Sequence, residues 1–425
     1  MSEQVSGQQR PALQSLDQAL ARLLAAVSPL AGHDTVATQD ALGRVLAQDV
    51  SSLLDVPPAD NTSMDGYALF AADVSKPGTV LPVAQRVPAG TVGALHQAGT
   101  AARIFTGAQI PLGADAVVMQ EQCEAVVDAS ATAGLGSVRV NAPVQSGQWI
   151  RRRGEDVQQG ALVLRAGERL NAASLGLAAS VGAAVLQVAR RPRVALFSTG
   201  DELVMPGEPL KPGAIYNSNR YTLLGLLQGL GCEVIDLGIV PDKLEATREA
   251  LRAAAAQADL IITSGGVSVG EEDHLRPAVE LEGRLDLWQI AIKPGKPLAF
   301  GEVRRGDAPN DGQAWFIGLP GNPVSSLVTF ALLVRPVILR LQGATALTPK
   351  CYRLRADFDW PRADRRQEFL RVRLNEAGGL DLFPNQSSGV LTSAHWADGL
   401  LDNPASNPIQ AGQLVSFLPF SELLS

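Results

Sequence analysis

The segment that decides the fold is RVALFSTGDEL at residues 193–203, in which a short apolar run ends in hydroxyl, glycine and carboxylate residues. A continuous apolar run bounded by turn residues is typical of a buried strand. The arrangement recurs in LIITSGG (260–266) and WFIGLPGN (315–322), and helical patterns at 221–230 and 244–256 separate the first two. Strands alternating with helices predict a mostly parallel sheet covered by helices, with ligands at the carboxyl ends of the strands.

The segments flanking this α/β domain, which we place at residues 191–342, have a different pattern. Residues 51–149 alternate strand-like runs with Gly/Pro turns, which predicts an inserted β-rich domain. It separates two parts of a connecting domain, residues 1–50 and 150–190, although the helix predicted after Ser15 by a capping box with Gln18 can pack elsewhere. Residues 343–425 predict a small C-terminal β domain. The predicted fold class is therefore multidomain α/β.

Composition excludes several classes of function. The net charge of −7 gives no overall basic field for nucleic acid or an anionic membrane, so an anionic substrate needs a local basic site. The three cysteines, Cys123, Cys232 and Cys351, lie too far apart for a C-x-x-C metal pair and fit a reducing cytoplasm. Residues 172–189 are nearly all apolar, but Gly182 and a high Ala content favour a small-residue helix followed by a strand over a membrane span.

Two of the polar motifs present carboxylates. NTSMDGYA (61–68) either forms an ordinary turn or exposes the carboxylate of Asp65. STGDE (198–202) follows a predicted strand, so it forms either a capped turn or a site for phosphate and Mg²⁺ that uses Glu202.

The segment TSGGVSVGEEDH (263–274) combines consecutive glycines with acidic residues. We interpret it as a phosphate cradle followed by the cation-binding carboxylate of Asp273. It also matches the hydrolase motif G-x-S-x-G through Ser268, but this serine lies several residues beyond the strand. Neither His274 nor His395 stands in a triad context, so the hydrolase reading is the weaker one.

Two further loops suit an anion. In KPGKP (293–297), prolines stiffen a loop that carries Lys293 and Lys296, whose ammonium groups repel each other unless an anion lies between them. GLPGNPVS (318–325) places Asn322 and Ser325 at a helix N-terminus, which either caps the helix or binds an anion. The arginines at 151–153 are expected to be a solvated charge run, and Trp288 and Trp315 to be core residues.

In this order, the motifs resemble those of the molybdopterin molybdenumtransferases, the family of MoeA and the gephyrin E-domain. The resemblance covers nearly the whole chain. It rests on segments 61–69, 105–122, 150–157, 195–203, 263–274, 292–301 and 318–326. It implies an elongated connecting domain and a molybdopterin-binding role for the α/β domain. It also implies a homodimer with a shared active site, in which molybdate is inserted into adenylated molybdopterin with Mg²⁺-dependent hydrolysis of the adenylate and release of AMP.

The resemblance also assigns roles to individual residues. Asp65 and Thr106 would enter the active site from the partner subunit, and Glu202, Asp242 and Asp273 would handle Mg²⁺ and the pyrophosphate. The remaining substrate-binding residues would be Ser264, Gly265, Gly266, Ser268, Lys293, Lys296, Pro320, Asn322, Pro323, Ser325, Arg371 and Ser388. The chain departs from the family pattern at 387–389, where it reads Ser-Ser-Gly, and at Asn217, where an Asp is common.

Other functions stay open at this point. The same α/β domain type serves molybdopterin adenylyltransferases and some nucleotide pyrophosphatases, but the inserted module with its MDGYA motif argues against both. A non-enzymatic scaffold is disfavoured because no long linker is visible. The resemblance further suggests a molybdopterin adenylyltransferase and apo-molybdoenzymes as protein partners.

Overall fold

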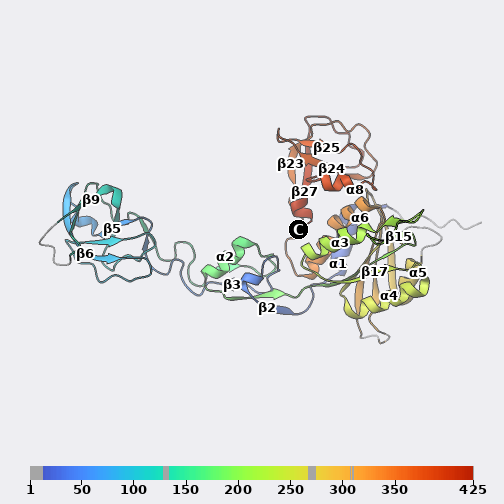
Figure 1. The fold of residues 1–425 in the computed structure, drawn as a ribbon, viewed down its shortest axis with the longest axis horizontal. Helices are drawn as coiled ribbons and strands as arrows, with labels where there is room; N and C mark the ends of the chain where they lie inside the picture. Colours follow the sequence, from blue (N-terminus) through green and yellow to red (C-terminus); the bar gives the residue numbers. More distant parts are fainter. Residues whose placement is uncertain (1–12, 128–133, 267–273, 307, 309–310, 425) are drawn as a thin grey trace, which may run out of the picture.

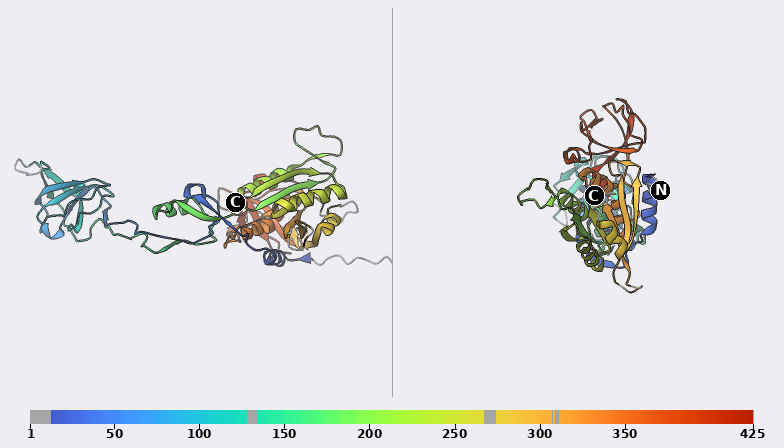
Figure 2. Two further views of the ribbon diagram at one scale, coloured as in Figure 1. Left: turned by 90° about the horizontal axis from the view of Figure 1, so that it is seen from below. Right: turned by 90° about the vertical axis from the view of Figure 1, so that its right-hand side faces the viewer.

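A computed structural model describes residues 13–127, 134–266, 274–306, 308 and 311–424. The molecule is elongated (Figure 1). The inserted β domain lies at one end, the connecting segment lies in the middle, and the α/β domain lies at the other end with the C-terminal domain beside it. The view turned by 90° about the horizontal axis shows the same separation of the two ends (Figure 2, left).

A seven-stranded sheet forms the centre of the α/β domain, in the order β1-β19-β21-β22-β18-β14-β17. Its strands are β1 (Leu13–Gln14), β14 (Arg193–Thr199), β17 (Glu233–Val240), β18 (Leu260–Ser264), β19 (Gly283–Ile290), β21 (Pro297–Arg304) and β22 (Gln313–Leu319). The predicted mostly parallel sheet is confirmed for β17, β14, β18 and β22, which pair in parallel. β21 runs antiparallel to both its neighbours because short connections join β19, β21 and β22.

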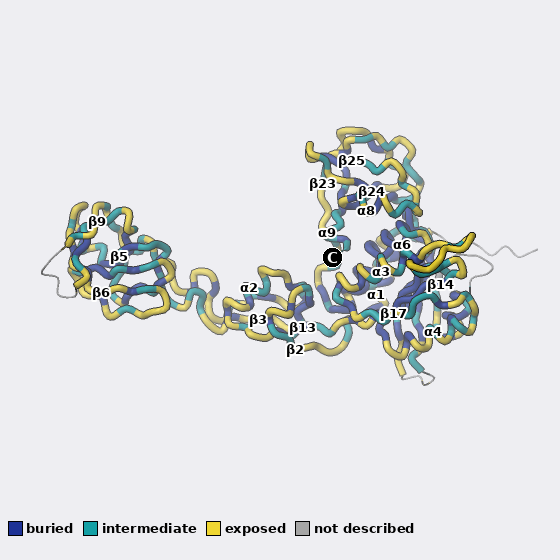
Figure 3. Tube along the Cα trace, in the orientation of Figure 1, coloured by how far each residue is buried: buried dark blue, intermediate teal, exposed yellow. Residues whose placement is uncertain are grey.

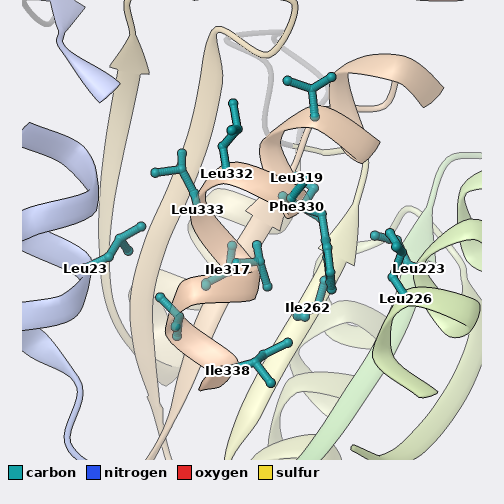
Figure 4. Close-up of a cluster of buried hydrophobic side chains, with 14 of the residues drawn as sticks. Leu23, Leu223, Leu226, Ile262, Ile317, Leu319, Phe330, Leu332, Leu333 and Ile338 are labelled. Atoms are coloured by element: carbon teal, nitrogen blue, oxygen red, sulfur yellow. The ribbon is translucent and has the colours of Figure 1, made fainter. Parts of the chain in front are cut away.

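Helices cover both faces of this sheet. One face carries α1 (Leu16–Ala26), α3 (Ser218–Gly229) and a continuous helix made of α6 (Pro323–Thr329), the π-helical segment η4 (Phe330–Val334) and α7 (Arg335–Leu341). The other face carries α4 (Leu244–Gln257) and α5 (Leu275–Glu282). Side chains alternate along β14, so that Leu196 joins the first core cluster and Phe197 the second. Figure 4 shows Leu23, Leu223 and Ile317 within the first cluster.

Helix α1 carries the predicted capping box, with Ser15 and Gln18 bonded to each other's backbone amides. It packs on the α/β domain through Ala19 and Leu23, so this part of residues 1–50 lies away from the connecting segment. In the part of the chain that the structure describes, one helix, Pro323–Leu341, is long and apolar enough to cross a membrane. That window is 94% buried inside the protein, which identifies it as a core helix.

The connecting segment is a chain of two-stranded ribbons around one short helix. Its strands pair as β13 (Val185–Ala189) with β2 (His33–Ala37), β12 (Leu162–Leu164) with β3 (Val50–Ser51), and β11 (Ile150–Arg151) with β4 (Asn61–Thr62). The helix is α2 (Ala172–Ser180), preceded by η1 (Thr38–Asp40). The prediction for residues 172–189, a helix, a turn at Gly182 and a strand, is confirmed.

The inserted domain has a six-stranded sheet in the order β8-β5-β7-β6-β10-β9. The strands are β5 (Gly66–Leu69), β6 (Thr79–Val87), β7 (Ala101–Ile104), β8 (Ala116–Met119), β9 (Cys123–Val126) and β10 (Ser137–Val140), with η2 (Ala71–Asp73) and η3 (Gln120–Gln122) between them. Figure 3 shows buried segments within this domain, separate from those of the α/β domain. It therefore has its own hydrophobic core.

The C-terminal sheet has the order β20-β24-β26-β27-β23, with β25 paired to β24. Its elements are β20 (Ile292–Lys293), β23 (Tyr352–Arg355), β24 (Gln367–Leu374), β25 (Leu380–Leu382), β26 (Gly399–Asn403) and β27 (Leu414–Pro419), with α8 (Leu391–Trp396) and α9 (Phe420–Leu423). Strand β20 belongs in sequence to the α/β domain but pairs in parallel with β24. The loop at 293–297 that carries Lys293 and Lys296, called the lysine loop below, is thereby attached to the C-terminal domain.

Two further predictions concern the two tryptophans and the run of arginines at 151–153. Trp288 is buried as predicted, and Trp315 is partly buried and stacks on Phe300 at a ring distance of 5.6 Å. The arginine run is exposed but not merely solvated, because Arg152 and Arg153 form ion pairs with Asp60 and Asp55 at 2.7 and 2.6 Å. These pairs tie the two strands of the connecting segment together.

Candidate active site

A polar cavity in the α/β domain lies at the carboxyl ends of its parallel strands, as the fold predicts. Its volume is about 550 Å³. The residues that line it are Thr199, Glu202, Leu203, Ile215, Tyr216, Asn217, Ser218, Asn219, Ser264, Gly265, Gly321, Asn322, Pro323 and Gly389. Of the residues expected from the sequence, Glu202, Ser264, Gly265, Asn322 and Pro323 therefore do meet around one cavity.

The floor of this cavity is closely packed around two glycines. Gly265 and Gly266 have φ angles of +92° and +64°, which side-chain-bearing residues rarely adopt. A Cβ atom on Gly265 would lie 2.8 Å from the carbonyl oxygen of Thr199, so this position has no room for a side chain. The Gly265 N–H donates to Leu319 O at 3.1 Å, so this amide is already used in holding β18 and β22 together. Any anion in the cradle would rely on other donors.

Three carboxylates gather beside the cavity: Asp201, Glu202 and Asp242. The Asp242 N–H donates to Asp201 Oδ1 at 3.4 Å. Burial raises the pKa of Asp242, and the negative charges of Asp201 and Glu202 raise it further, although His274 opposes the shift. A partly buried carboxylate beside like charges is stabilised by a cation, and oxygen ligands of this kind suit Mg²⁺. These residues therefore fit the expected metal.

The described carboxylates do not complete a metal site by themselves. Among the residues that the structure describes, no three acidic, His or Cys side chains are grouped closely enough to hold an ion. The predicted third ligand, Asp273, and the predicted cradle residue Ser268 lie outside the described residues. The Mg²⁺ assignment of Glu202 and Asp242 thus stays a prediction.

Two helix N-termini face the cavity. Asn217 caps α3, because its Oδ1 accepts the Arg220 N–H at 3.2 Å. Asn322 stands at the N-cap of α6 but its side chain makes no capping bond, so its amide is left for a ligand. Pro323 follows as the first helical residue, where a missing N–H costs nothing. Ser325 is buried within the first turn and Pro320 is buried just before the helix.

A second, smaller cavity of about 250 Å³ lies where the C-terminal domain meets the lysine loop. It is lined by Lys293, Pro294, Trp360, Glu368, Leu370, Arg371, Gln386 and Ser387. The expectation of two repelling lysines is wrong for Lys293, because its Nζ lies 3.1 Å from Glu368 Oε1 and 3.4 Å from Asp364 Oδ2. Sequence reasoning missed these carboxylates, since they follow Lys293 by over seventy positions and reach it only through the pairing of β20 with β24. Lys296 is half-buried and is not among the lining residues.

Arg371 supplies the second positive charge of the small cavity. It is 1% exposed, and its guanidinium donates to Ser393 Oγ at 3.1 Å, Phe369 O at 3.2 Å and Ser387 O at 3.3 Å. Burial lowers its pKa to about 10. Since all three acceptors are neutral and no carboxylate pairs with it within the described ranges, this buried cation is suited to an anionic ligand.

The two cavities share a wall. Ser387 lines the small cavity and Gly389 the large one, so the intervening Ser388 lies between them. Its carbonyl oxygen accepts the Val324 N–H at 2.9 Å, at the start of α6. Ser388 is therefore fixed to the α/β domain through its backbone, and the residues on either side of it line the two cavities.

Asp65 and Thr106 form a compact pair in the inserted domain. Asp65 Oδ1 accepts the backbone N–H of Thr106 at 2.7 Å and its hydroxyl at 2.8 Å. These two hydrogen bonds lower the pKa of Asp65. The pair lies at the opposite end of the chain from both cavities, as the position of β5 in Figure 1 shows. Within one chain the structure does not bring them to the active site.

Several lining residues were not assigned from sequence. Thr199 belongs to the STGDE motif, from which only Glu202 was predicted to bind a ligand, and Tyr216 and Asn219 belong to none of the predicted motifs. Their place in the cavity depends on the short parallel pair β15 (Leu203–Val204) and β16 (Ile215–Tyr216), which brings residues around 216 back to the strand end. Asn217, where an Asp is common in the family, is 2% exposed and lines the cavity. This departure from the family pattern could therefore have identified Asn217 as a site residue.

Comparison with known proteins covers the whole chain. Residues 14–182 match the MoeA N-terminal region (domain I and II), residues 195–340 a probable molybdopterin binding domain, and residues 353–420 the MoeA C-terminal region (domain IV). A molybdopterin molybdenumtransferase of Haemophilus influenzae is 40% identical over 420 residues, which cover 96% of this chain and 99% of the relative. Molybdopterin molybdenumtransferase 2 of Mycobacterium tuberculosis is 37% identical, with 92% and 95% covered.

The solved structures agree with the sequence comparison. The structure of a molybdopterin biosynthesis moeA protein from Pyrococcus horikoshii superimposes with a TM-score of 0.80 at 28% identity, covering 96% of this chain and 100% of the other. The resemblance drawn from the motifs is thus confirmed over all domains. The chain belongs to the molybdopterin molybdenumtransferase (MoeA) family.

Proposed function

We propose that this protein is a molybdopterin molybdenumtransferase that inserts molybdate into adenylated molybdopterin and releases AMP and molybdenum cofactor. The observation that carries the proposal is the pair of adjoining cavities. The large one has the hydroxyl, amide and carboxylate lining expected for a phosphorylated substrate, and the small one holds a buried arginine without an acidic partner among the described residues.

In this proposal the large cavity binds the adenylated pterin. Thr199, Ser264 and Asn322 supply donors for the pyrophosphate near the N-terminus of α6. Bound Mg²⁺, held by Glu202, Asp242 and Asp273, would neutralise the pyrophosphate charge. The protein residues orient the phosphoanhydride and stabilise charge, which is what phosphoryl chemistry chiefly requires.

The small cavity takes molybdate. Lys293 and Arg371 line it and carry the charge that a dianion needs. Lys296, Ser325 and Ser388, which the family motifs assign to the substrate, are proposed to complete the oxyanion site. Because residues 387 and 389 line the small and the large cavity, an oxyanion in the small cavity would lie near the substrate in the large one.

We propose a homodimer for a geometrical reason. Asp65 and Thr106 are held in one rigid pair, yet they lie at the far end of the chain from their expected partners in the active site. A second copy of the chain, running the other way, can bring this pair to the cavity. A symmetric dimer then has two shared sites.

We also propose a cytoplasmic location, which fits the three unpaired cysteines, Cys123, Cys232 and Cys351. A molybdopterin adenylyltransferase is proposed to supply the substrate, and apo-molybdoenzymes to accept the product. Binding of nucleic acid or membrane is not part of the proposal.

The deciding experiment incubates the protein with adenylated molybdopterin, molybdate and Mg²⁺. AMP release and reconstitution of an apo-molybdoenzyme are measured together. We expect both activities in the wild type and a strong loss of both in Glu202→Gln. AMP release that proceeds equally well without molybdate, and gives no active cofactor, would instead identify a pyrophosphatase and refute the proposal.

A further inference from the structure

Lys293 forms an ion pair with the buried carboxylate of Glu368. Strand β20 pairs with β24 so that Lys293 stands opposite Glu368. The Lys293 Nζ lies 3.1 Å from Glu368 Oε1, and the Glu368 side chain is only 1% exposed, whereas that of Lys293 is 41% exposed. Asp364 Oδ2 lies 3.4 Å from the same nitrogen. Lys293 therefore lines the small cavity with its ammonium group beside one buried and one partly buried carboxylate.

The carboxylate of Glu368 is itself firmly anchored. Its second oxygen, Oε2, accepts the Trp360 Nε1–H at 2.8 Å, the Asp364 N–H at 3.1 Å and the Asn403 amide at 3.4 Å. Donors thus approach both oxygens, and only a carboxylate can accept on both sides. A glutamine here would keep its oxygen on the Trp360 side and turn its NH₂ group toward the Lys293 ammonium, where two donors face each other.

We infer that Glu368 is a positioning residue that holds the Lys293 ammonium in place for the oxyanion. This inference rests on the proposed function, in which the small cavity binds molybdate. A free lysine side chain has many rotamers, and fixing it before the ligand arrives removes an ordering cost from binding. Glu368 accepts one of the three N–H donors of the ammonium and Asp364 lies within ion-pair distance, so N–H donors remain for the ligand.

An alternative role for Glu368 predicts the opposite change in molybdate affinity. If the carboxylate merely competed with the oxyanion for Lys293, its removal would strengthen anion binding. If it positions Lys293, its removal weakens binding. Calorimetry of molybdate binding to Glu368→Gln therefore separates the two, and we expect affinity about tenfold lower than in the wild type.

Two readouts distinguish positioning from general damage to the domain. The KM for molybdate should rise while binding of adenylated molybdopterin is unchanged. In a double-mutant cycle, Glu368→Gln should have no further effect once Lys293→Ala is present. The matched control is Asp402→Asn on β26, the strand on the other side of β24, because Asp402 Oδ1 accepts the Gln367 side-chain amide at 2.6 Å and neither residue lines the small cavity. It should leave molybdate affinity unchanged.

Each other outcome overturns the inference. Tighter or unchanged molybdate binding in Glu368→Gln, or additive effects with Lys293→Ala, would show that Glu368 does not act through Lys293. If Glu368→Gln does not fold, Glu368→Asp, which keeps both acceptors but is one methylene shorter, must give an intermediate loss, and wild-type affinity there overturns the inference. A wild type that binds no molybdate removes the proposed function as well, whereas a response in Lys293→Ala without one in Glu368→Gln removes only this inference.

Discussion

Replacing Arg371 with methionine should weaken oxyanion binding strongly and leave the fold intact. The side chain is 1% exposed, and its three hydrogen bonds go to the neutral acceptors Ser393 Oγ, Phe369 O and Ser387 O. Methionine is unbranched and apolar, so it can fill much of the same space. A buried cation without an anionic partner is a cost to the empty protein, which the ligand is expected to relieve.

The pKa of Arg371 gives the magnitude. Burial lowers it from the ordinary 12.5 to about 10, and each pKa unit corresponds to about 1.36 kcal/mol. The charged form therefore costs on the order of 3 kcal/mol, and a bound dianion that recovers most of this would gain about two orders of magnitude in affinity. The three hydrogen bonds lost in the variant are worth about 1 kcal/mol each. Removing the buried charge offsets most of this loss, so stability should stay within about 2 kcal/mol of the wild type.

The assay is calorimetric titration of molybdate into wild type, Arg371→Met and a control, Arg353→Met. Arg353 is exposed on the same domain and donates to Ser416 Oγ at 3.2 Å and Leu414 O at 2.8 Å, away from the cavity. We expect affinity to fall about a hundredfold in Arg371→Met and to stay unchanged in the control. Equal affinity in Arg371→Met and wild type would refute the reasoning and make Arg371 a structural residue.

Three further predictions concern assembly and stability. Mixed dimers of Asp65→Ala and Glu202→Ala chains should regain part of the AMP release that each lacks alone, and zero activity after proven subunit exchange would exclude a shared site. Asp259→Ala should cost about 3–5 kcal/mol in chemical denaturation, because its 4% exposed carboxylate binds Arg190 at 2.8 and 2.9 Å, and a loss below about 1 kcal/mol would contradict this. Burial raises the pKa of Asp259, but its hydrogen bonds with Arg190 and the backbone lower the pKa below 3.8. The stabilisation by this ion pair is therefore present above pH 3.8 and is lost as the pH falls through the pKa of Asp259 in the folded protein. His96 is 6% exposed, neither of its ring nitrogens has a hydrogen-bond partner, and burial lowers its pKa below 6.5. The stability of the wild type should therefore fall as the pH drops below 6.5, and that of His96→Phe should not. Identical pH dependence of thermal unfolding in the two proteins would show that His96 does not titrate in this range.

Local sequence alone determined the elements and the family. The apolar runs at 194–197 and 260–263, the capping box at Ser15 and the small-residue helix before Gly182 all form where predicted, because each depends on neighbouring residues only. The same holds for the strand-end motifs, whose glycines, hydroxyls and prolines set the backbone conformation locally. Motif order across the chain then identified the family, which the full-length comparison confirms.

Only the tertiary structure decided how charges are paired. The sequence pattern suggested that Lys293 would be repelled by Lys296, but the pairing of β20 with β24 gives it Glu368 as a partner instead. The same pairing puts Ile292 and Lys293 in the C-terminal sheet, although β19, which ends at Ile290, belongs to the sheet of the α/β domain. Contacts between residues far apart in the chain depend on register and domain packing, which no local pattern encodes. For the same reason, the separation of Asp65 from the cavity became visible only in three dimensions.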